Sequence, residues 1–175
     1  DEFFFFILQL RRNKEFAEEK RIVSLNAASF INEGDIIAID SGSTAIVFAE
    51  ILKQKFSQLT VVTHSKDVFD ILCNYKNFEV ILAGGHYLRD ENAFCGELCI
   101  EFYKKIYMKK GFIFPSAVSL EYGICDYNKD LYSIQKELLN RCEEIYILAD
   151  SSKFEKNAML KLCDTDKNFV YITDN

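Results

Sequence analysis

Short apolar runs recur along the chain, and between them apolar residues are spaced by three or four positions. The runs are rich in β-branched and aromatic residues and are too short to be helices by themselves, so each is typical of a buried strand. The predicted strands lie at Ile36–Ile39, Leu59–Thr63, Phe78–Leu82, Phe112–Phe114, Glu144–Ala149 and Phe169–Ile172.

Helical spacing fills most of the intervals between these runs. We expect helices at about Asn13–Ile31, with Phe16, Val23, Ala27 and Phe30 on its apolar stripe, and at Ala45–Phe56, Phe69–Leu72, Gly96–Lys110 and Ile134–Cys142. Acidic residues begin the fourth of these helices and lysines end it, which suits the helix dipole, so we expect those lysines to be solvated. Strands that alternate with helices predict an α/β fold with a mostly parallel sheet covered on both faces.

The first residues do not fit this alternation. Phe3 to Leu8 form an apolar patch that begins abruptly, without turn signals before it, and left bare it would favour association or aggregation. We therefore expect residues 1–14 to be the cut end of an interdomain linker. Residues 15–175 are long enough to form one domain with a sizeable core.

Composition narrows the classes of function. A formal net charge of −6 gives no excess of cations to neutralise phosphates, so this segment is a poor nucleic-acid binder by itself. The six cysteines form no C-x-x-C pair and have no histidines at zinc spacing, which favours free thiols and argues against a metal site. No signal peptide or membrane span is recognisable, and we expect a cytoplasmic location without a membrane partner.

The stretch that organises the chain is Asp40 with the turn Ser41-Gly42-Ser43-Thr44, between the first strand and its helix. Such a turn leaves unpaired N–H groups where the helix dipole is positive, so the backbone is suited to hold an anion. Alternatively, the hydroxyl groups only cap the helix. Local sequence leaves both interpretations open.

Polar residues also follow the other predicted strands. They are Thr63, His64 and Ser65, the pair Gly84-Gly85, and the segment Asp150-Ser151-Ser152-Lys153. Because the carboxyl ends of parallel strands meet at one edge of a sheet, and ligands bind there, we expect these residues to converge on one rim. This convergence favours the anion-binding interpretation over simple capping.

These strand ends, in this order, resemble the C-terminal effector-binding domain of the DeoR family of bacterial transcriptional repressors. The resemblance is carried by Glu18–Arg21, Gly34-Asp35, Asp40–Thr44, Thr63–Ser65, Gly84-Gly85, Gly96, Gly123, Lys136 and Asp150–Phe154. It implies a three-layer Rossmann-like sandwich of the NagB/RpiA/CoA transferase-like group. It also implies a sensor for a phosphorylated sugar, without a cofactor, that acts on DNA through an N-terminal winged helix-turn-helix absent from this sequence. We expect the intact protein to be a homo-oligomer.

The resemblance also implies roles for single residues. Asp40 would contact ligand hydroxyls, and the backbone of Ser41, Gly42, Ser43 and Thr44 would hold the phosphate. Thr63, His64 and Ser65 would line the pocket with Gly84, Gly85, Asp150 and Ser152, and Lys136 and Lys153 would bring positive charge. The plainer alternatives are that Lys136 is an exposed helix lysine and that Asp150 caps a turn.

One segment departs from the family pattern. Relatives tend to carry Gly-Ala-Asp-Gly after the fourth strand, whereas this chain has Pro115–Ser119. The ligand therefore stays open, as does a rival interpretation as a sugar-phosphate isomerase or deaminase of the same fold group. An enzyme of that kind needs a set of acid/base carboxylates, and only Glu121 follows the fourth strand closely, so we predict no catalysis.

Overall fold

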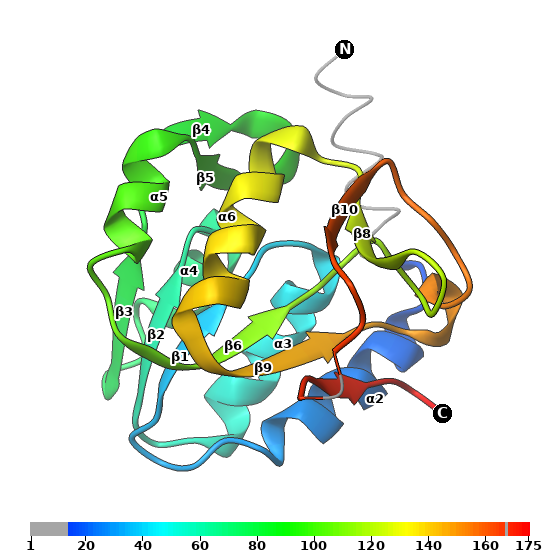
Figure 1. Ribbon diagram of the computed structural model, residues 1–175. Coiled ribbons are helices and arrows are strands. Elements are labelled where there is room, and N and C mark those ends of the chain that lie inside the picture. The colour runs from blue at the N-terminus through cyan, green and yellow to red at the C-terminus, as the bar shows by residue number, and fades with distance from the viewer. Residues whose placement is uncertain (1–13, 167) are drawn as a thin grey trace.

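The computed structural model describes residues 14–166 and 168–175 (Figure 1). The patch Phe3 to Leu8 lies outside these residues. The helices are α2 (Ala17–Ala28), α3 (Ser43–Lys55), α4 (Lys66–Leu72), α5 (Glu97–Tyr103) and α6 (Lys129–Arg141), with short 3-10 turns at Arg89–Glu91 and Ser151–Lys153. The strands are β1 (Ile36–Ile39), β2 (Leu59–Thr63), β3 (Phe78–Leu82), β4 (His86–Leu88), β5 (Ala93–Cys95), β6 (Met108–Ile113), β7 (Ala117–Ser119), β8 (Gly123–Asp126), β9 (Cys142–Leu148), β10 (Leu160–Cys163) and β11 (Val170–Ile172).

The main sheet has six strands in the order β11-β9-β6-β1-β2-β3, and every neighbouring pair is parallel. This confirms the predicted α/β fold. Successive strands run outward from β1 through β2 to β3 on one side and from β6 through β9 to β11 on the other. The strand order therefore reverses between β1 and β6, which is where ligands bind in open parallel sheets.

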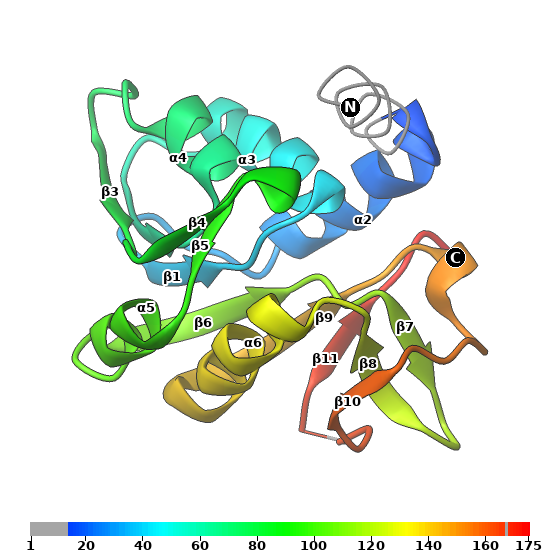
Figure 2. The ribbon, with the colours of Figure 1, turned by 90° about the horizontal axis from the view of Figure 1, so that it is seen from above.

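Helices cover the sheet in two layers, which Figure 2 shows on opposite sides of it. The core alternates along β1 accordingly. Ile37 and Ile39 pack into the cluster formed with α2, α3 and α4, whereas Ala38 belongs to the cluster formed with α5 and α6. Successive residues of a strand point to opposite faces, so a fully apolar strand is what a sheet buried on both faces requires.

Aromatic side chains fill the first of these clusters. The ring of Phe112 stacks on Tyr146 with centroids 4.9 Å apart, and Phe48 of α3 lies 4.9 Å from Phe112 on a tilted plane. Burying each such side chain contributes about 1.5–3 kcal/mol. This packing fixes α3, and hence the turn that precedes it, against the centre of the sheet.

The predicted helix from Gly96 to Lys110 is wrong beyond Tyr103. The chain leaves α5 there and enters β6 at Met108, so Lys110 lies inside a strand and is 3% exposed instead of solvated. Its ammonium donates to Oδ2 of Asp35 at 2.5 Å and to the carbonyl of Phe30 at 2.7 Å. This buried ion pair joins β6 to the loop between α2 and β1.

The apolar stripe predicted for the first helix is confirmed only in its middle. Val23 and Ala27 are fully buried, whereas Phe16 and Phe30 are 45% and 41% exposed. Phe16 precedes α2 in a left-handed conformation, with φ of 54°, and Phe30 follows the end of the helix. Neither residue therefore continues the helical spacing.

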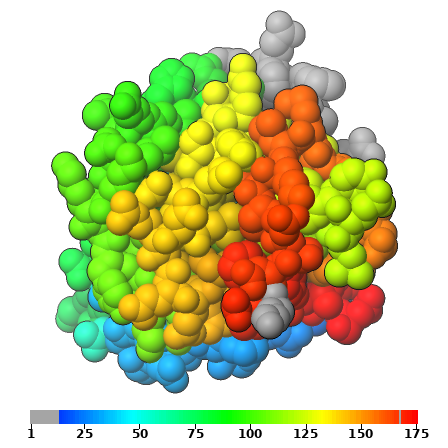
Figure 3. Space-filling model, in the orientation of Figure 1, coloured from blue at the N-terminus to red at the C-terminus, as the bar shows by residue number. Residues whose placement is uncertain are grey.

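Two small sheets were not predicted from the sequence. Their strands have only three or four residues each. One is the hairpin of β4 and β5, and the other contains β7, β8 and β10 in antiparallel pairs. On the face in Figure 3, β10 lies beside α6. The second sheet thus extends the layer of α5 and α6 past the end of β6.

Candidate functional site

Asp40 lies at the carboxyl end of β1 and is fully buried. Its carboxylate accepts hydrogen bonds from the backbone N–H of Ser41 at 2.8 Å and of Phe114 at 3.2 Å, and from Nε2 of Gln135 at 3.1 Å. Hydrogen bonds to a charged group are each worth about 1.5–3 kcal/mol. Asp40 thereby connects β1, β6 and α6 where the strand order reverses.

His64 approaches the same carboxylate from the end of β2. Its Nε2 lies 3.3 Å from Oδ1 of Asp40, and its Nδ1 lies 3.1 Å from the hydroxyl of Tyr103 in α5. All three side chains are fully buried, and burial raises the pKa of Tyr103 well above its usual value. The tyrosine therefore stays neutral, and Nε2 of His64 lies against Asp40 but makes no hydrogen bond in the described structure.

A second buried carboxylate, which the sequence analysis did not single out, belongs to Asp126 at the end of β8. Nε2 of Gln135 donates to its Oδ2 at 2.9 Å. Its Oδ1 accepts from the hydroxyl of Ser116 at 3.0 Å and from the backbone N–H groups of Tyr127 and Asn128 at 2.7 and 3.2 Å. One amide thus bridges the carboxylates of Asp40 and Asp126.

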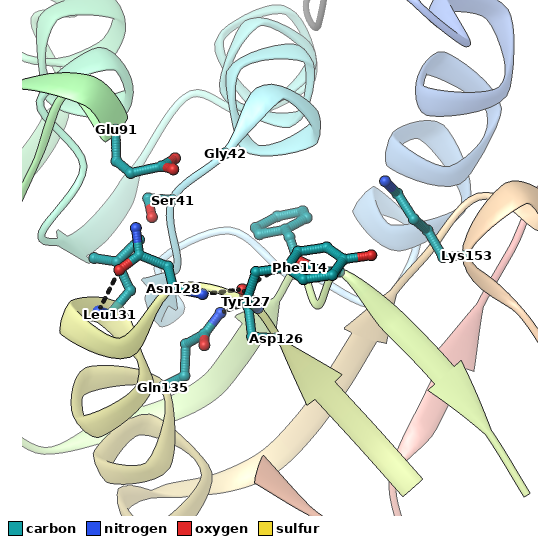
Figure 4. A pocket seen from close by; sticks show the side chains of 11 residues that line it. Ser41, Gly42, Glu91, Phe114, Asp126, Tyr127, Asn128, Leu131, Gln135 and Lys153 are labelled. Atoms are coloured by element: carbon teal, nitrogen blue, oxygen red, sulfur yellow. Dashed lines mark hydrogen bonds between the residues drawn. The ribbon is translucent and has the colours of Figure 1, made fainter. Parts of the chain in front are cut away.

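These groups surround a hollow of about 240 Å³ above the ends of β1 and β6 (Figure 4). It is lined by Ser41, Gly42, Glu91, Phe114, Ser116, Asp126, Tyr127, Asn128, Leu131, Gln135 and Lys153. A smaller hollow of about 60 Å³ shares part of this wall and is lined by Gly42, Ser43, Thr44, Phe114, Pro115, Ser116, Leu148, Ala149, Asp150 and Lys153. We call them the large hollow and the small hollow.

The start of α3 forms one wall of the small hollow. Gly42 precedes the helix with φ of 119° and ψ of 173°, and no side chain caps the helix N-terminus. A Cβ atom at Gly42 would meet no atom within 4 Å, but its positive φ disfavours any other residue. Since Ser43 and Thr44 begin a 13-residue helix without a side-chain cap, its N-terminal N–H groups and dipole face a position suited to an anion.

Lys153 borders both hollows from the 3-10 turn after β9. Its ammonium has no ion-pair partner within residues 14–166 and 168–175. Asp150 caps this turn, with Oδ1 accepting from the N–H of Ser152 at 3.0 Å and from the Ser152 hydroxyl. Its Oδ2 is buried without a hydrogen-bond partner in the described structure. The turn thus places one cation and one unpartnered acceptor beside the start of α3.

Other predicted site residues lie away from the hollows. The hydroxyl of Thr63 donates to the carbonyl of Ile39 at 2.7 Å, and Ser65 caps α4 by accepting from the N–H of Val68 at 3.3 Å. The hairpin of β4 and β5 covers this strand end, with the N–H of Phe94 donating to the carbonyl of His64 at 2.8 Å. Thr63, His64 and Ser65 therefore line neither hollow.

The glycine pair after β3 serves the same hairpin. Gly84 and Gly85 are exposed at the far edge of the sheet and line neither hollow. A Cβ atom at Gly85 would lie 2.4 Å from the carbonyl oxygen of Cys95, so the close approach of β5 requires glycine there. What this hairpin contributes to the large hollow is Glu91, which sequence reasoning missed.

Lys136 is exposed on α6, with its ammonium 5.5 Å from the centre of the Tyr132 ring, and borders neither hollow. Its neighbour Gln135 is the residue that faces Asp40 and Asp126. The helical spacing of Leu131, Ile134 and Leu138 contained the signal, because Gln135 falls within that buried stripe and only 2% of it is exposed.

The cysteines, like the histidines, give no sign of a metal site or a redox centre. Within the described residues, no three or more His, Cys, Asp or Glu side chains gather closely enough to hold a metal ion. Burial raises the pKa of Cys99 and of Cys142 to about 12, so these thiols stay protonated at neutral pH. The part of the chain that the structure describes contains no helix long and apolar enough to cross a membrane.

The structure is a doubly wound α/β domain with two adjoining hollows at its switch point. The sequence model of the family described as "DeoR C terminal sensor domain" matches residues 15–175. The chain therefore belongs to the family of DeoR C-terminal sensor domains.

Curated relatives agree with this membership. The chain is 29% identical over 164 residues to the HTH-type transcriptional regulator IolR of Bacillus subtilis, covering 93% of this chain and 64% of that protein. It is 32% identical over 159 residues to the lactose phosphotransferase system repressor of Lactococcus lactis, covering 90% of this chain and 62% of the repressor. The chain thus spans less than two thirds of the length of these relatives.

Solved structures show the fold to be shared more widely. Ribose 5-phosphate isomerase A from Neisseria gonorrhoeae matches with a TM-score of 0.54 at 21% identity, covering 77% of this chain and 52% of the isomerase. The eIF2B delta subunit from Chaetomium thermophilum matches with a TM-score of 0.61 at 15% identity, covering 93% and 58%. These likenesses confirm the predicted fold group and leave function to be argued from the site.

Proposed function

We propose that this domain senses a phosphorylated sugar for a transcriptional regulator, with the phosphate in the small hollow and the sugar in the large one. The observation that carries the proposal is the start of α3, where a helix without a side-chain cap faces the same hollow as Lys153. Helix N-terminal N–H groups and a lysine ammonium are both donors that favour a phosphate. The large hollow beside them is lined by polar side chains that suit hydroxyl groups.

A regulator fits the site better than an enzyme does. Asp40 is fully buried and already accepts three hydrogen bonds, so it is poorly placed to take a proton from a substrate. One of the two relatives is named as a transcriptional regulator and the other as a repressor. The likeness to ribose 5-phosphate isomerase, at 21% identity, supports the fold alone.

We further propose that DNA is bound by another part of the protein to which this domain belongs. IolR is named as a helix-turn-helix regulator, and this chain matches 64% of its length. The net charge of −6 opposes DNA binding by the sensor domain itself. Ligand binding would then act on DNA affinity by favouring one arrangement of the whole protein.

Thermal unfolding with a panel of sugar monophosphates tests the proposal. A ligand at about 100 times its Kd should stabilise the domain by roughly 2.7 kcal/mol, which for this size shifts the melting temperature by about 5–10 °C. Gly42→Leu should abolish the shift, because the side chain would project over the start of α3. The matched control is Gly34→Leu, another glycine with positive φ and open space around it, at a turn away from the hollows.

The control separates loss of the site from strain at a turn. Gly34→Leu should lower the melting temperature but keep the ligand response, whereas Gly42→Leu should lose the response. An unchanged response in Gly42→Leu would show that the phosphate does not bind at α3.

A further inference from the structure

The large hollow is rich in carboxylates. Glu91 and Asp126 line it, and Asp40 lies buried directly behind Gln135, whereas Lys153 is the cation in its lining. Lys153 also borders the small hollow, where the proposed phosphate would engage it. The carboxylate of Asp126, with that of Asp40 behind it, therefore makes the wall around Gln135 negative.

Asp126 keeps acceptor capacity at this surface, because within the described residues its Oδ2 accepts only from the amide of Gln135, whereas its Oδ1 accepts three hydrogen bonds. The hydroxyl of Ser116 donates to Oδ1 of Asp126, and the amide nitrogen of Gln135 donates to Oδ2 of both Asp40 and Asp126. A carboxylate only accepts, so the nitrogen of the amide, and not its oxygen, must face this pair. The amide oxygen Oε1 of Gln135 is consequently left buried and without a partner in the described structure.

We propose that the large hollow selects an effector whose carbon chain carries hydroxyl groups and rejects one whose chain carries a carboxylate, with Asp126 as the discriminating residue and Gln135 as its support. The inference rests on the proposed function, because it takes the phosphate to lie at α3. A hydroxyl group donates to an acceptor-rich wall, whereas a second carboxylate would meet Asp126 as a like charge in a partly desolvated space. The domain is thereby a sensor of neutral sugar phosphates or polyol phosphates and not of sugar-acid phosphates.

Gln135→Lys should weaken or reverse the preference for a hydroxyl group over a carboxylate. A lysine ammonium has a similar reach, can donate to both Asp40 and Asp126, and adds a positive charge where the wild type has a neutral amide. The matched control is Lys136→Gln, the opposite exchange at the next position, which is exposed and borders neither hollow. Asp126→Asn is a second variant, which removes the negative charge with little change of shape.

The experiment uses pairs of phosphorylated probes that differ only in a terminal CH2OH or carboxylate. Suitable pairs are glycerol 3-phosphate with 3-phosphoglycerate, erythritol 4-phosphate with 4-phosphoerythronate, and glucitol 6-phosphate with 6-phosphogluconate. Calorimetry measures the Kd of each probe. For the pair that binds best, the wild type and Lys136→Gln should each bind the alcohol at least tenfold more tightly than the acid. In Gln135→Lys or Asp126→Asn, whichever folds, this ratio should fall at least tenfold.

Equal or tighter binding of the acid by the wild type would overturn the inference, as would a ratio that neither folded variant changes. Binding of inorganic phosphate without binding of any alcohol would also overturn it, because the large hollow would then not accept a hydroxylated chain. Failure of the proposed function has a different signature, in which neither inorganic phosphate nor any probe of either series binds.

Discussion

The backbone N–H of Phe114 donates a hydrogen bond of 3.2 Å to Oδ2 of Asp40, which joins β6 to β1 where the strand order of the sheet reverses. Parallel strands normally diverge beyond their carboxyl ends at such a point and leave a crevice. Here the carboxylate closes the bottom of that crevice, and the two hollows lie above it. Asp40 is therefore first a structural residue of the site.

Asp40→Asn should destabilise the domain by about 2 kcal/mol or more. One carboxylate oxygen becomes an NH2 group that faces an existing donor, and a buried donor left unpaired costs roughly 1–3 kcal/mol. The melting temperature should fall by about 4–8 °C. Glu121→Gln, at an exposed acid between β7 and β8, is the matched control and should leave it unchanged. Equal melting temperatures for both variants would contradict the structural role of Asp40.

The ion pair of Asp35 and Lys110 should make the domain less stable in acid. Burial acts to raise the pKa of Asp35, but hydrogen bonds from Lys110 and from the backbone of Asn32, with the nearby lysine charges, lower it below its usual value. A lowered pKa means that the stabilisation is fully present above the unfolded-state value, about 3.9, and is lost as pH falls through the folded-state value. The free energy of unfolding of the wild type should therefore exceed that of Asp35→Asn at pH 6, and this difference should shrink below about pH 4.

Removing Lys110, the cation of the same ion pair, should lower the free energy of unfolding more than removing an exposed lysine does. Lys110→Met removes the ammonium nearest to a mostly buried carboxylate, which keeps Lys109 at 3.8 Å and the N–H of Asn32 at 2.9 Å. Breaking a fully buried pair typically costs about 3–5 kcal/mol, so we expect a loss towards the lower end of that range. Lys105→Met, at an exposed lysine after α5, is the matched control and should change the free energy of unfolding by about 0.5 kcal/mol or less. Denaturant unfolding at pH 7 measures both. Similar values for the two variants would show that the pair contributes little.

We predict that the domain does not isomerise ribose 5-phosphate. Asp40 is fully buried, and the carboxylate of Asp126 is held by hydrogen bonds from four protein groups, so neither is well placed to act as the base that such a reaction needs. Incubation followed by quantification of ribulose 5-phosphate is the measurement. Product formation that disappears in Glu91→Gln or Asp126→Asn would place an enzyme in this site instead of a sensor.

Coupling to DNA is expected in the full-length protein. A sensor changes DNA affinity only if the sugar phosphate prefers one of two arrangements, with a coupling free energy of about 1–3 kcal/mol, or roughly 5- to 150-fold in affinity. Operator DNA must then change the Kd for the sugar phosphate by the same factor. Titrating the ligand with and without operator DNA measures this, and equal Kd values would exclude the coupling. That the intact protein is a homo-oligomer stays a prediction, and measuring its molecular mass in solution tests it.

The sequence predicted the main sheet well and the site incompletely. The bounds of β1, β2 and β3 were predicted to the residue. For β1 the reason is that a strand buried on both faces is a continuous apolar run. Lys110 was misplaced because a buried lysine with a distant partner, 75 positions away in Asp35, looks the same in sequence as an exposed one. Asp126 and Glu91 were missed because they come from the small antiparallel strands and turns, whose pairing depends on tertiary contacts.

The role of a single position within a helix is harder to predict. Lys136 was assigned a role from the family resemblance, whereas the structure orients α6 by its apolar stripe and so turns Gln135 inward. Neighbouring residues of an α-helix point about 100° apart, so one side chain can face the hollow while the next lies in solvent. The buried face of a helix must therefore be known before a role is assigned to any one of its residues.

The two ends of β6 have different neighbours. Near its start, Lys110 holds Asp35 and the carbonyl of Phe30, and just past its end Phe114 borders both hollows. Four residues of extended chain span about 13 Å, and both ends are fixed by hydrogen bonds to charged groups. The strand thus connects the two hollows to the loop that follows α2. If the proposed ligand displaces Phe114, the end of α2 should move with it, because Lys110 holds that loop to the same strand.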